Sequence, residues 1–348
     1  MIALEKTSMD STVNFEVDGV HLGHLRVPHS VHRSAYGHIA IPIAVLKNGA
    51  GPTVLLTGGV HGDEYEGPVA LSNFVQKVRL DEIQGRVVVV PALNYPAFMA
   101  ASRVSPIDGI NLNRTFPGRK DGSVTEVIAD YVTRVLLPLA DFVFDVHAGG
   151  SSLQYLPSVL SALPDESDAG WQTARLIEAM APERIIYFDG DRALSGEDRV
   201  IGNYARKNGA VYLCGEFGGG STVNPDGLRM VEHCVSRFLM HLGVLSAAGA
   251  LQYAETSRVL DQPVRTLSYS MDEPGLFLFA QRPGFFAPSF RLGEVVRQGQ
   301  LAGHIYDSTD FWKTPTAVTF ECGGLVVCQR TFAQVEVGDC LGHLAQPC

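Results

Sequence analysis

The chain has 348 residues, 46% of them hydrophobic and 18% charged, which is enough apolar material for about two domains of ordinary size. Its formal net charge is -10 and no run of Lys and Arg forms a basic patch, so nucleic acid is excluded as an expected partner. No signal-peptide pattern opens the chain and no apolar stretch reaches the roughly 20 residues of a transmembrane helix, so we expect a cytoplasmic protein without membrane association.

The first 50 residues have the pattern of β hairpins. The segments VNFEVDG (13–19) and VHLGHLRVP (20–28) flank an Asp-Gly turn, and HIAIPIAVLKNGAG (38–51) alternates before an Asn-Gly turn. We expect residues 1–50 to form hairpins that pack on the main domain. The histidines of this region have no carboxylate partner in the pattern and are expected to be surface or structural residues: His21, His24, His29, His32 and His38.

From residue 51 to residue 250, short and nearly all-apolar strands alternate with helical segments. The predicted strands are PTVLLTGG (52–59), GRVVVVPAL (85–93), ADFVFDVHAGG (140–150), RIIYFDG (184–190) and AVYLCGEFGGG (210–220). The predicted helices cover 64–78, 123–138, 167–181, 197–208 and 225–245. Such strands are buried on both faces, which predicts an α/β fold with a mostly parallel or mixed sheet between layers of helices. The ligand site of such a sheet lies beyond the carboxyl ends of its strands.

The C-terminal region, residues 255–348, consists of short strands punctuated by Gly and Pro, which predicts a small β domain of the sandwich or barrel type. Within it, LGEVVRQGQLAGHI (292–305) resembles one hairpin layer of a lipoyl- or biotinyl-type sandwich, without a lysine at the turn. The six cysteines of the chain form no CxxC pair, so we expect reduced thiols rather than a disulfide framework or a zinc ribbon.

The stretch TGGVHGDEYEG (57–67) places polar side chains in a glycine-rich turn between a strand and a helix. His61 and Glu64 are three residues apart there, and His147 ends the apolar strand FVFDVH. Two histidines and one carboxylate at strand ends are the three-ligand set of a catalytic zinc, which leaves its fourth position to water. Such an ion lowers the pKa of that water to about 7 and polarises a carbonyl. Asp145, on the same strand face as His147, is either an acceptor for a ligand histidine or an arginine, or a polar strand end.

A general base is predicted on another strand end. Glu216 ends the apolar segment VYLCGE and is followed by Phe and three glycines. A buried carboxylate at this place is costly unless it is paired or functional. As a base it would take the proton of the attacking water and deliver it to the leaving nitrogen. The alternative is a capping or salt-bridging glutamate.

The long connection 94–122 is the second unusual feature, because it combines Arg103, Asn113 and Arg114 with Asp-Gly and Pro-Gly turns. The adjacent amide and guanidinium suit a substrate carboxylate. An arginine near the metal would stabilise the oxyanion that develops during the reaction. Asn94, at the start of the loop, is expected to help shape the pocket.

Five segments resemble, in this order, motifs of the succinylglutamate desuccinylase/aspartoacylase family, which is related to zinc carboxypeptidases: GGVHGDEYEGPVAL, PALNYPAF, DGINLNRTFPG, DVHAGG and GEFGGG. The resemblance is strong over residues 50–245, and the family also carries a C-terminal β domain. The resemblance implies one zinc ion per chain, bound by His61, Glu64 and His147. It implies that Glu216 is the catalytic base and that Arg103 polarises the scissile carbonyl. Asn113 and Arg114 would form the clamp for the substrate carboxylate.

Within the family, LTGGVHGDEYEGPVAL, SRVSPIDG and NLNRTFPGRKDGSVTEVIADY are most similar to the N-acetyl-diaminobutyrate deacetylase branch. One departure is Ala148, at a position where that branch has serine. We therefore expect a zinc-dependent amidohydrolase that removes a short acyl group from an N-acyl amino acid, with N-acetyl-2,4-diaminobutyrate as the first candidate.

Three alternatives stay open at this stage. They are a deacylase of another N-acyl amino acid such as N-succinylglutamate or N-acetylaspartate, a zinc carboxypeptidase acting on a small peptide, and a non-catalytic carboxylate-binding protein on the same fold. The resident metal could equally be manganese, cobalt or iron, because histidine and carboxylate ligands accept several divalent ions. A homo-oligomer is compatible with the sequence, which does not decide the oligomeric state.

Overall fold

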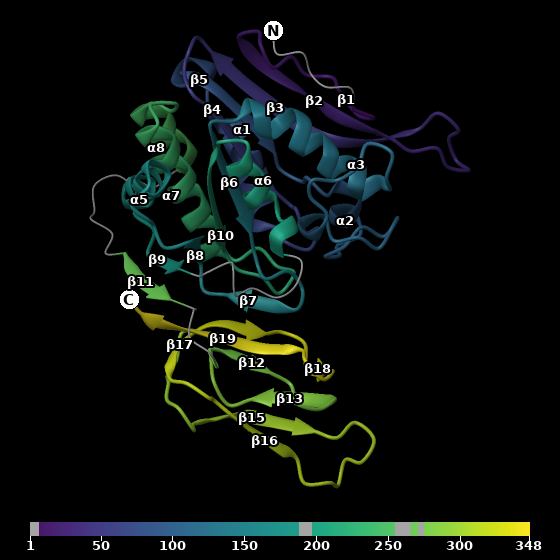
Figure 1. Ribbon diagram of the computed structural model, residues 1–348, viewed down its shortest axis with the longest axis vertical. Helices are drawn as coiled ribbons and strands as arrows, with labels where there is room; N and C mark the ends of the chain where they lie inside the picture. The colour runs from purple at the N-terminus through teal and green to yellow at the C-terminus, as the bar shows by residue number, and fades with distance from the viewer. Residues whose placement is uncertain (1–6, 188–196, 255–265, 271–274) are drawn as a thin grey trace.

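The structure, a computed structural model, describes residues 7–187, 197–254, 266–270 and 275–348. Figure 1 shows a larger part, with helices beside a sheet, above a smaller part made of strands near the C-terminus. The end of the predicted strand 184–190 and two stretches of the predicted β domain, 255–265 and 271–274, lie outside the described residues. Among the helices of the described ranges, none has the length and apolar character needed to cross a membrane.

The larger of the two sheets in the described residues is mixed and contains fifteen strands. The strands are β1 (Asp10–Ser11), β2 (Gly19–Pro28), β3 (His38–Asn48), β4 (Thr53–Gly58), β5 (Gly85–Val90), β6 (Phe142–His147), β7 (Leu153–Tyr155), β8 (Ser158–Ser161), β9 (Arg184–Tyr187), β10 (Val211–Glu216), β11 (Leu267–Ser270), β12 (Phe277–Phe279), β14 (Val295–Val296), β17 (Gly324–Arg330) and β19 (Cys340–Pro347). In its centre, β5, β4, β6 and β10 are neighbours in that order and run parallel. The β2–β3 hairpin extends the sheet through antiparallel pairing of β3 with β5.

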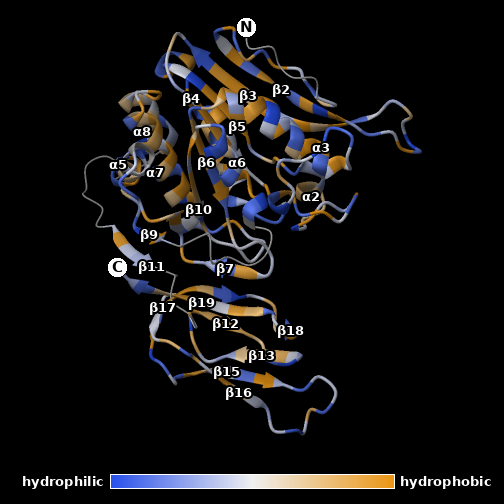
Figure 2. Ribbon diagram, in the orientation of Figure 1, coloured by the Kyte–Doolittle hydropathy of each residue, from blue (hydrophilic) through white to orange (hydrophobic). Residues whose placement is uncertain are grey.

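Helices cover both faces of the central strands. They are α1 (Glu66–Lys77), α2 (Tyr95–Met99), α3 (Val124–Tyr131), α4 (Leu137–Leu139), α5 (Asp168–Met180), α6 (Ile201–Lys207), α7 (Pro225–His241) and α8 (Ala247–Ala254), with the shorter turns η1 (Leu80–Glu82), η2 (Leu112–Arg114), η3 (Val132–Leu136) and η5 (Glu197–Arg199). In Figure 2, α3 and α7 carry both hydrophobic and hydrophilic residues, as expected for helices with one face on the sheet and the other in solvent.

Two separate hydrophobic cores explain why the central strands are mostly apolar. Along β6, Phe144 and Val146 pack into the core beneath α1, α5, α7 and α8, whereas Val143 packs into the core beneath α3 and α6. Along β5, Val87 and Val88 divide between the two cores in the same way. Successive side chains of a strand point to opposite faces, so a strand between two helical layers has no polar face. The predicted α/β fold is therefore confirmed.

The predicted helices agree with the structure, but several details differ. The helix predicted over 123–138 is built from α3, η3 and α4, and it begins with a capping box between Ser123 and Glu126. The short strands β7 and β8 and the helix α8 were not predicted. The strand predicted over 13–19 is wrong, because Asn14 Oδ1 accepts the N–H groups of Glu16 and Val17 and closes a local turn.

The C-terminal region forms a sandwich of two sheets around one apolar core that includes Leu278, Phe286 and Val326. The second sheet contains β13 (Gly284–Pro288), β15 (Leu301–Tyr306), β16 (Thr316–Thr319) and β18 (Gln334–Val335). The segment 292–305 is not one hairpin layer as predicted. Its two strands belong to different sheets, since β14 pairs with β17 and β15 pairs with β13 and β16. The division of the chain into domains at 1–50, 51–250 and 255–348 stays a prediction.

Candidate metal centre

Three neighbouring strands deliver the predicted metal and base residues to one edge of the sheet. β4, β6 and β10 run parallel, and His147 at the end of β6 lies directly opposite Glu216 at the end of β10. The turn that follows β4 carries His61 and Glu64. The carboxyl ends of these strands lie side by side (Figure 1), so residues distant in sequence meet at a position fixed by the strand register.

His61, Glu64 and His147 are all buried, and each offers one ligand atom within 4.8 Å of the others. Both imidazoles turn Nδ1 towards the Glu64 carboxylate, at 2.6 Å from Oε1 for His61 and at 3.0 Å from Oε2 for His147. The backbone N–H of Ala148 donates to the same Oε2 at 3.1 Å. Because that contact uses the backbone, the alanine in place of serine leaves it intact. Two imidazole nitrogens and one carboxylate fit a catalytic zinc ion.

Asp145 lies against His147, as its predicted role of an acceptor for that histidine requires. Its Oδ2 lies 2.8 Å from His147 Nε2 and accepts from the Tyr212 hydroxyl at 3.1 Å, while Oδ1 accepts from Thr57 Oγ1 at 2.6 Å. The two carboxyl groups fix the orientation of the His147 ring, with Nε2 towards Asp145 and Nδ1 towards Glu64. In this orientation Nδ1 is the atom that would face a metal ion held by Glu64.

The charges of the group are interdependent. Burial alone would raise the pKa of Glu64, but the adjacent His61 and His147 outweigh it and hold that pKa well below its usual range. Burial would likewise lower the pKa of His147, yet Asp145 and Glu64 raise it well above the ordinary value. For His61, burial prevails and lowers the pKa. An ionised Glu64 is the form that binds a cation.

Glu216 has the opposite electrostatic environment to Glu64. Its side chain is partly buried, and Oε2 is a buried atom without a hydrogen-bond partner among the described residues. Burial, followed by the negative charge of Glu64, raises the pKa of Glu216 to about 8. One site thus holds a carboxyl group with a lowered pKa, Glu64, and one with a raised pKa, Glu216. This is the arrangement expected for an anionic ligand, Glu64, beside a general acid and base, Glu216.

Arg103 reaches the group from the loop that follows α2. Its Nη1 lies 3.7 Å from Glu64 Oε1, and its side chain is 45% exposed. The loop is fixed to the turn that carries His61 and Glu64 by a hydrogen bond from Gly62 N–H to the Ser102 carbonyl at 3.1 Å. A Cβ added at Gly62 would lie 2.0 Å from the backbone carbon of Ala97, so glycine is required for this close approach.

Asn113 and Arg114 lie in η2 of the same loop, and hydrogen bonds connect them to α6 and to each other. Asn113 is buried, and its Oδ1 accepts the N–H of Ile201, the first residue of α6, at 3.0 Å. Arg114 Nη1 donates to the Asn113 carbonyl at 2.8 Å. The Asn113 oxygen is thus occupied, while its NH2 group keeps the donor capacity that a carboxylate needs. Their role as a substrate clamp stays a prediction.

Two further residues belong to this region. Asn94 is fully buried, its backbone N–H donates to the Gly59 carbonyl at 2.9 Å, and neither side-chain atom has a hydrogen-bond partner among the described residues. Glu66 is also fully buried. No role was predicted for it, although it lies in the same stretch, TGGVHGDEYEG, as His61 and Glu64. The signal in its sequence is its place in the first turn of a helix, directly before Gly-Pro.

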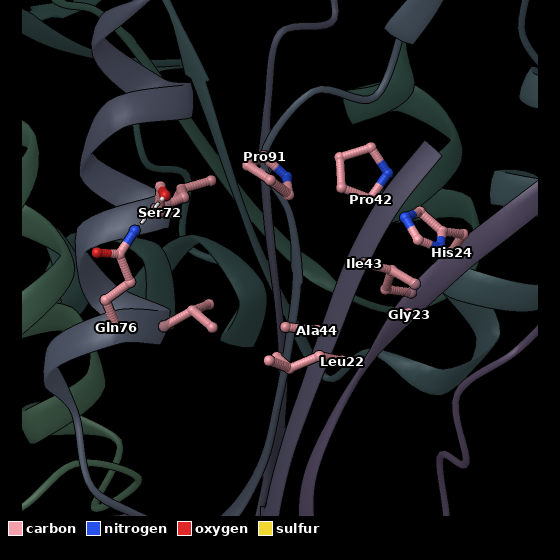
Figure 3. Close-up of a pocket in the computed structure, with 11 residues that line it drawn as sticks. Leu22, Gly23, His24, Pro42, Ile43, Ala44, Ser72, Gln76 and Pro91 are labelled. Atoms are coloured by element: carbon pink, nitrogen blue, oxygen red, sulfur yellow. Dashed lines mark hydrogen bonds between the residues drawn. The ribbon is translucent and has the colours of Figure 1, made fainter. Parts of the chain in front are cut away.

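A pocket of about 350 Å³ lies elsewhere, between the β2–β3 hairpin and α1 (Figure 3). Its walls include Leu22, Pro42 and Val75, and His24 is the one ionisable side chain among the residues that line it. It contains none of the predicted ligands, and a single histidine on an apolar surface has no partner for catalysis. The candidate chemistry therefore lies at the strand ends.

The geometry agrees with comparisons to known proteins. The catalytic-domain model of the succinylglutamate desuccinylase/aspartoacylase family matches residues 50–242. The chain belongs to this family. It is 38% identical over 342 residues, 97% of this chain and 95% of the relative, to the N-alpha-acetyl-L-2,4-diaminobutyric acid deacetylase of Halomonas elongata.

Solved structures of the family cover nearly the whole chain. The product-bound ectoine utilization protein EutE (DoeB) of Ruegeria pomeroyi is 34% identical, with a TM-score of 0.89 and coverage of 98% of this chain and 100% of that one. A succinylglutamate desuccinylase of Silicibacter sp. TM1040 is 32% identical, with a TM-score of 0.89 and 99% of both chains covered. The predicted family, fold and enzyme class, a hydrolase of the deacylase type, are confirmed.

Proposed function

We propose that this deacylase is zinc-dependent and releases acetate from Nα-acetyl-L-2,4-diaminobutyrate or a closely similar N-acyl amino acid. The observation that carries the proposal is the meeting of His61, Glu64 and His147 beside Glu216, in a chain 38% identical to a deacetylase of that name. The 2.8 Å contact between Asp145 and His147 supports metal binding, since ligand histidines commonly donate their second N–H to a carboxylate.

His61 and His147 would hold the ion through Nδ1 and Glu64 through its carboxylate. When bound, a zinc ion supplies Lewis-acid chemistry that lowers the pKa of water and polarises a carbonyl oxygen. In the proposed hydrolysis, Glu216 takes a proton from the attacking water and passes it to the leaving nitrogen. The C–O bond forms and the C–N bond breaks, so that one amide and one water yield a carboxylate and a protonated amine.

The arginines of the loop would act on the substrate. The Arg103 guanidinium, 3.7 Å from Glu64, stabilises negative charge on the carbonyl oxygen in the transition state. Asn113 and Arg114 hold the substrate carboxylate by an amide donor and a guanidinium fork. The acyl-bearing end of the substrate is thereby oriented towards Glu216.

A hydrolysis panel with the full-length protein tests the proposal. The panel contains Nα-acetyl-L-2,4-diaminobutyrate, its Nγ-acetyl isomer, N-succinylglutamate, N-acetylaspartate and a dipeptide, each with and without a chelator. N-succinylglutamate is included because a 32% identical relative is a succinylglutamate desuccinylase. We expect the highest kcat/KM for the Nα-acetyl compound, loss of activity on chelation and recovery with zinc.

Different outcomes separate the parts of the proposal. A higher kcat/KM for N-succinylglutamate would overturn the substrate and keep the chemistry. Full activity in protein shown by elemental analysis to contain no divalent metal would overturn the metal-dependent mechanism.

A further inference from the structure

Glu66 connects the beginnings of two helices from within the core. It is the first residue of α1, two positions beyond Glu64, and it has no exposed surface. Its Oε1 accepts the backbone N–H of Asn224 at 3.0 Å. Asn224 is the N-cap of α7, and its own side chain accepts the N–H groups of the first turn of that helix. A single carboxylate therefore couples α1, the helix that follows His61 and Glu64, to α7, the helix that follows the Glu216 strand.

The turn between Glu216 and α7 passes directly over this carboxylate. A Cβ added at Gly218 would lie 2.1 Å from Glu66 Oε1. Gly218 and Gly219 have φ values of +148° and +137°, which side chains disfavour. The two glycines let the backbone rest on the carboxylate, so the position of the turn depends on the length and shape of the Glu66 side chain.

The same turn is held from its other side by the loop that follows His147. The Gly218 carbonyl accepts the N–H of Gly149 at 3.1 Å and that of Tyr155 at 2.9 Å, and the N–H of Phe217 donates to the His147 carbonyl at 3.0 Å. The residues directly after Glu216 are thus fixed between the His147 loop and the Glu66 carboxylate.

We propose that Glu66 is a positioning residue, whose carboxylate sets the place of the Gly218–Gly219 turn and thereby of Glu216 relative to the metal ligands. The inference rests on the proposed function for its kinetic consequence, but its structural consequence is independent of it. An apolar side chain at position 66 would leave the Asn224 N–H without its acceptor and the turn without its support.

The competing explanation is that Glu66 merely joins α1 to α7. The chain offers a matched control, because Asn73 on α1 donates from Nδ2 to Glu232 Oε1 on α7 at 2.9 Å. Asn73→Ala removes a polar contact between the same two helices and leaves the Gly218 turn untouched. If Glu66 only joined the two helices, Asn73→Ala and Glu66→Ala should change kcat to a similar extent.

The experiment uses full-length, zinc-loaded protein in five forms: wild type, Glu66→Ala, Glu66→Asp, Glu66→Gln and Asn73→Ala. Metal content, thermal midpoint, kcat and KM with Nα-acetyl-L-2,4-diaminobutyrate, and crystal structures of the wild type, Glu66→Ala and Asn73→Ala are measured. We expect Glu66→Ala to shift the turn by about 1 Å and to lower kcat about 30-fold, with KM and metal content within about twofold. Glu66→Gln keeps an acceptor oxygen and should lose less than about threefold in kcat.

Glu66→Asp, shorter by one methylene, keeps the proposal testable if the alanine variant does not fold, and it should lower kcat about tenfold. Asn73→Ala should lower the thermal midpoint while kcat stays within about twofold of wild type. An unmoved turn in Glu66→Ala, wild-type kcat in both Glu66→Ala and Glu66→Asp, or an equal kcat loss in Asn73→Ala would each overturn the inference. A wild type that hydrolyses nothing would instead refute the proposed function, and the crystal structures would still decide the role of Glu66.

Discussion

The strand ends and the loop 94–122 contribute to the same candidate site in different ways. His147 and Glu216 end adjacent parallel strands and lie opposite each other in the sheet register, so the backbone fixes their relative position. Arg103 lies in irregular backbone and is 45% exposed on its side chain, whereas Arg114 ends the short helical turn η2. The strand ends provide a buried group with fixed geometry, whereas the loop provides cations that can adjust to a substrate.

Burial at the strand ends also changes the pKa values of the carboxyl groups there. Glu64 and Glu216 have pKa values displaced in opposite directions, the first below its usual range and the second to about 8, because both are taken out of solvent and lie beside other ionisable groups. Groups in such surroundings are suited to proton transfer and metal binding. We therefore expect substitutions at the strand ends to change chemistry. In the loop, we expect substitutions at Arg114 to change substrate affinity and substitutions at Arg103 to change stabilisation of the transition state.

The largest effect is expected at Glu216. Glu216→Gln keeps the shape of the side chain but removes the proton acceptor, so kcat should fall about 1000-fold, within the range of general-base contributions. The measurements are steady-state kinetics with Nα-acetyl-L-2,4-diaminobutyrate and zinc content by elemental analysis, which should stay that of wild type. A variant within tenfold of the wild-type kcat, or one that has lost its metal, would contradict the assignment of Glu216 as base.

A smaller effect of another kind is expected at Arg114. Arg114→Lys keeps the positive charge but loses the planar fork, so KM should rise about tenfold with kcat within about threefold of wild type. Arg103→Lys is the matched substitution in the same loop, and there we expect the loss in kcat instead, because Arg103 is proposed to act on the transition state. Equal changes in kcat and KM for the two variants would remove the proposed distinction between them.

The same contrast explains what the sequence could predict. Strands that are buried on both faces have an unambiguous apolar pattern, so the convergence of His61, Glu64 and His147 followed from the fold itself. The structure places one ligand atom of each within 4.8 Å of the others. Loop geometry depends on contacts that no local pattern reveals, such as the Asn113 oxygen bonded to the N–H of Ile201. The role of Asp145 was undecided for the same reason, because its partners come from neighbouring strands.

The interaction of Glu66 was missed on similar grounds. Its partner Asn224 is 158 residues away, and a glutamate in the first turn of a helix is ordinarily explained by the helix dipole alone. The strand predicted over 13–19 failed for the opposite reason. There a purely local interaction, the turn closed by Asn14, outweighs an alternating pattern that is typical of a strand.

The smallest expected effect concerns stability and pH in metal-free protein. The pKa of Glu216 is about 8 in the fold and 4.5 in the unfolded reference, so between these values the folded chain binds the proton that the unfolded chain releases. Glu216 therefore lowers the free energy of unfolding as pH rises through this window. Glu216→Gln removes the effect, and its unfolding free energy relative to wild type should rise from pH 5 to pH 9, with an upper limit of about 4 kcal/mol set by the two pKa values.

A loop carboxylate provides the control. Burial would raise the pKa of Asp108, but its hydrogen bonds from Thr125 and Ser123 outweigh burial and lower it below 3.8, so the stability that Asp108 contributes is lost only below that pH. Asp108→Asn should therefore differ from wild type by a constant amount between pH 5 and pH 9. Urea unfolding of chelated wild type, Glu216→Gln and Asp108→Asn at pH 5, 7 and 9 makes the comparison. A pH-independent difference for Glu216→Gln would mean that the strand-end carboxyl group is ionised in the fold like the loop one, and the electrostatic contrast between the two regions would be lost.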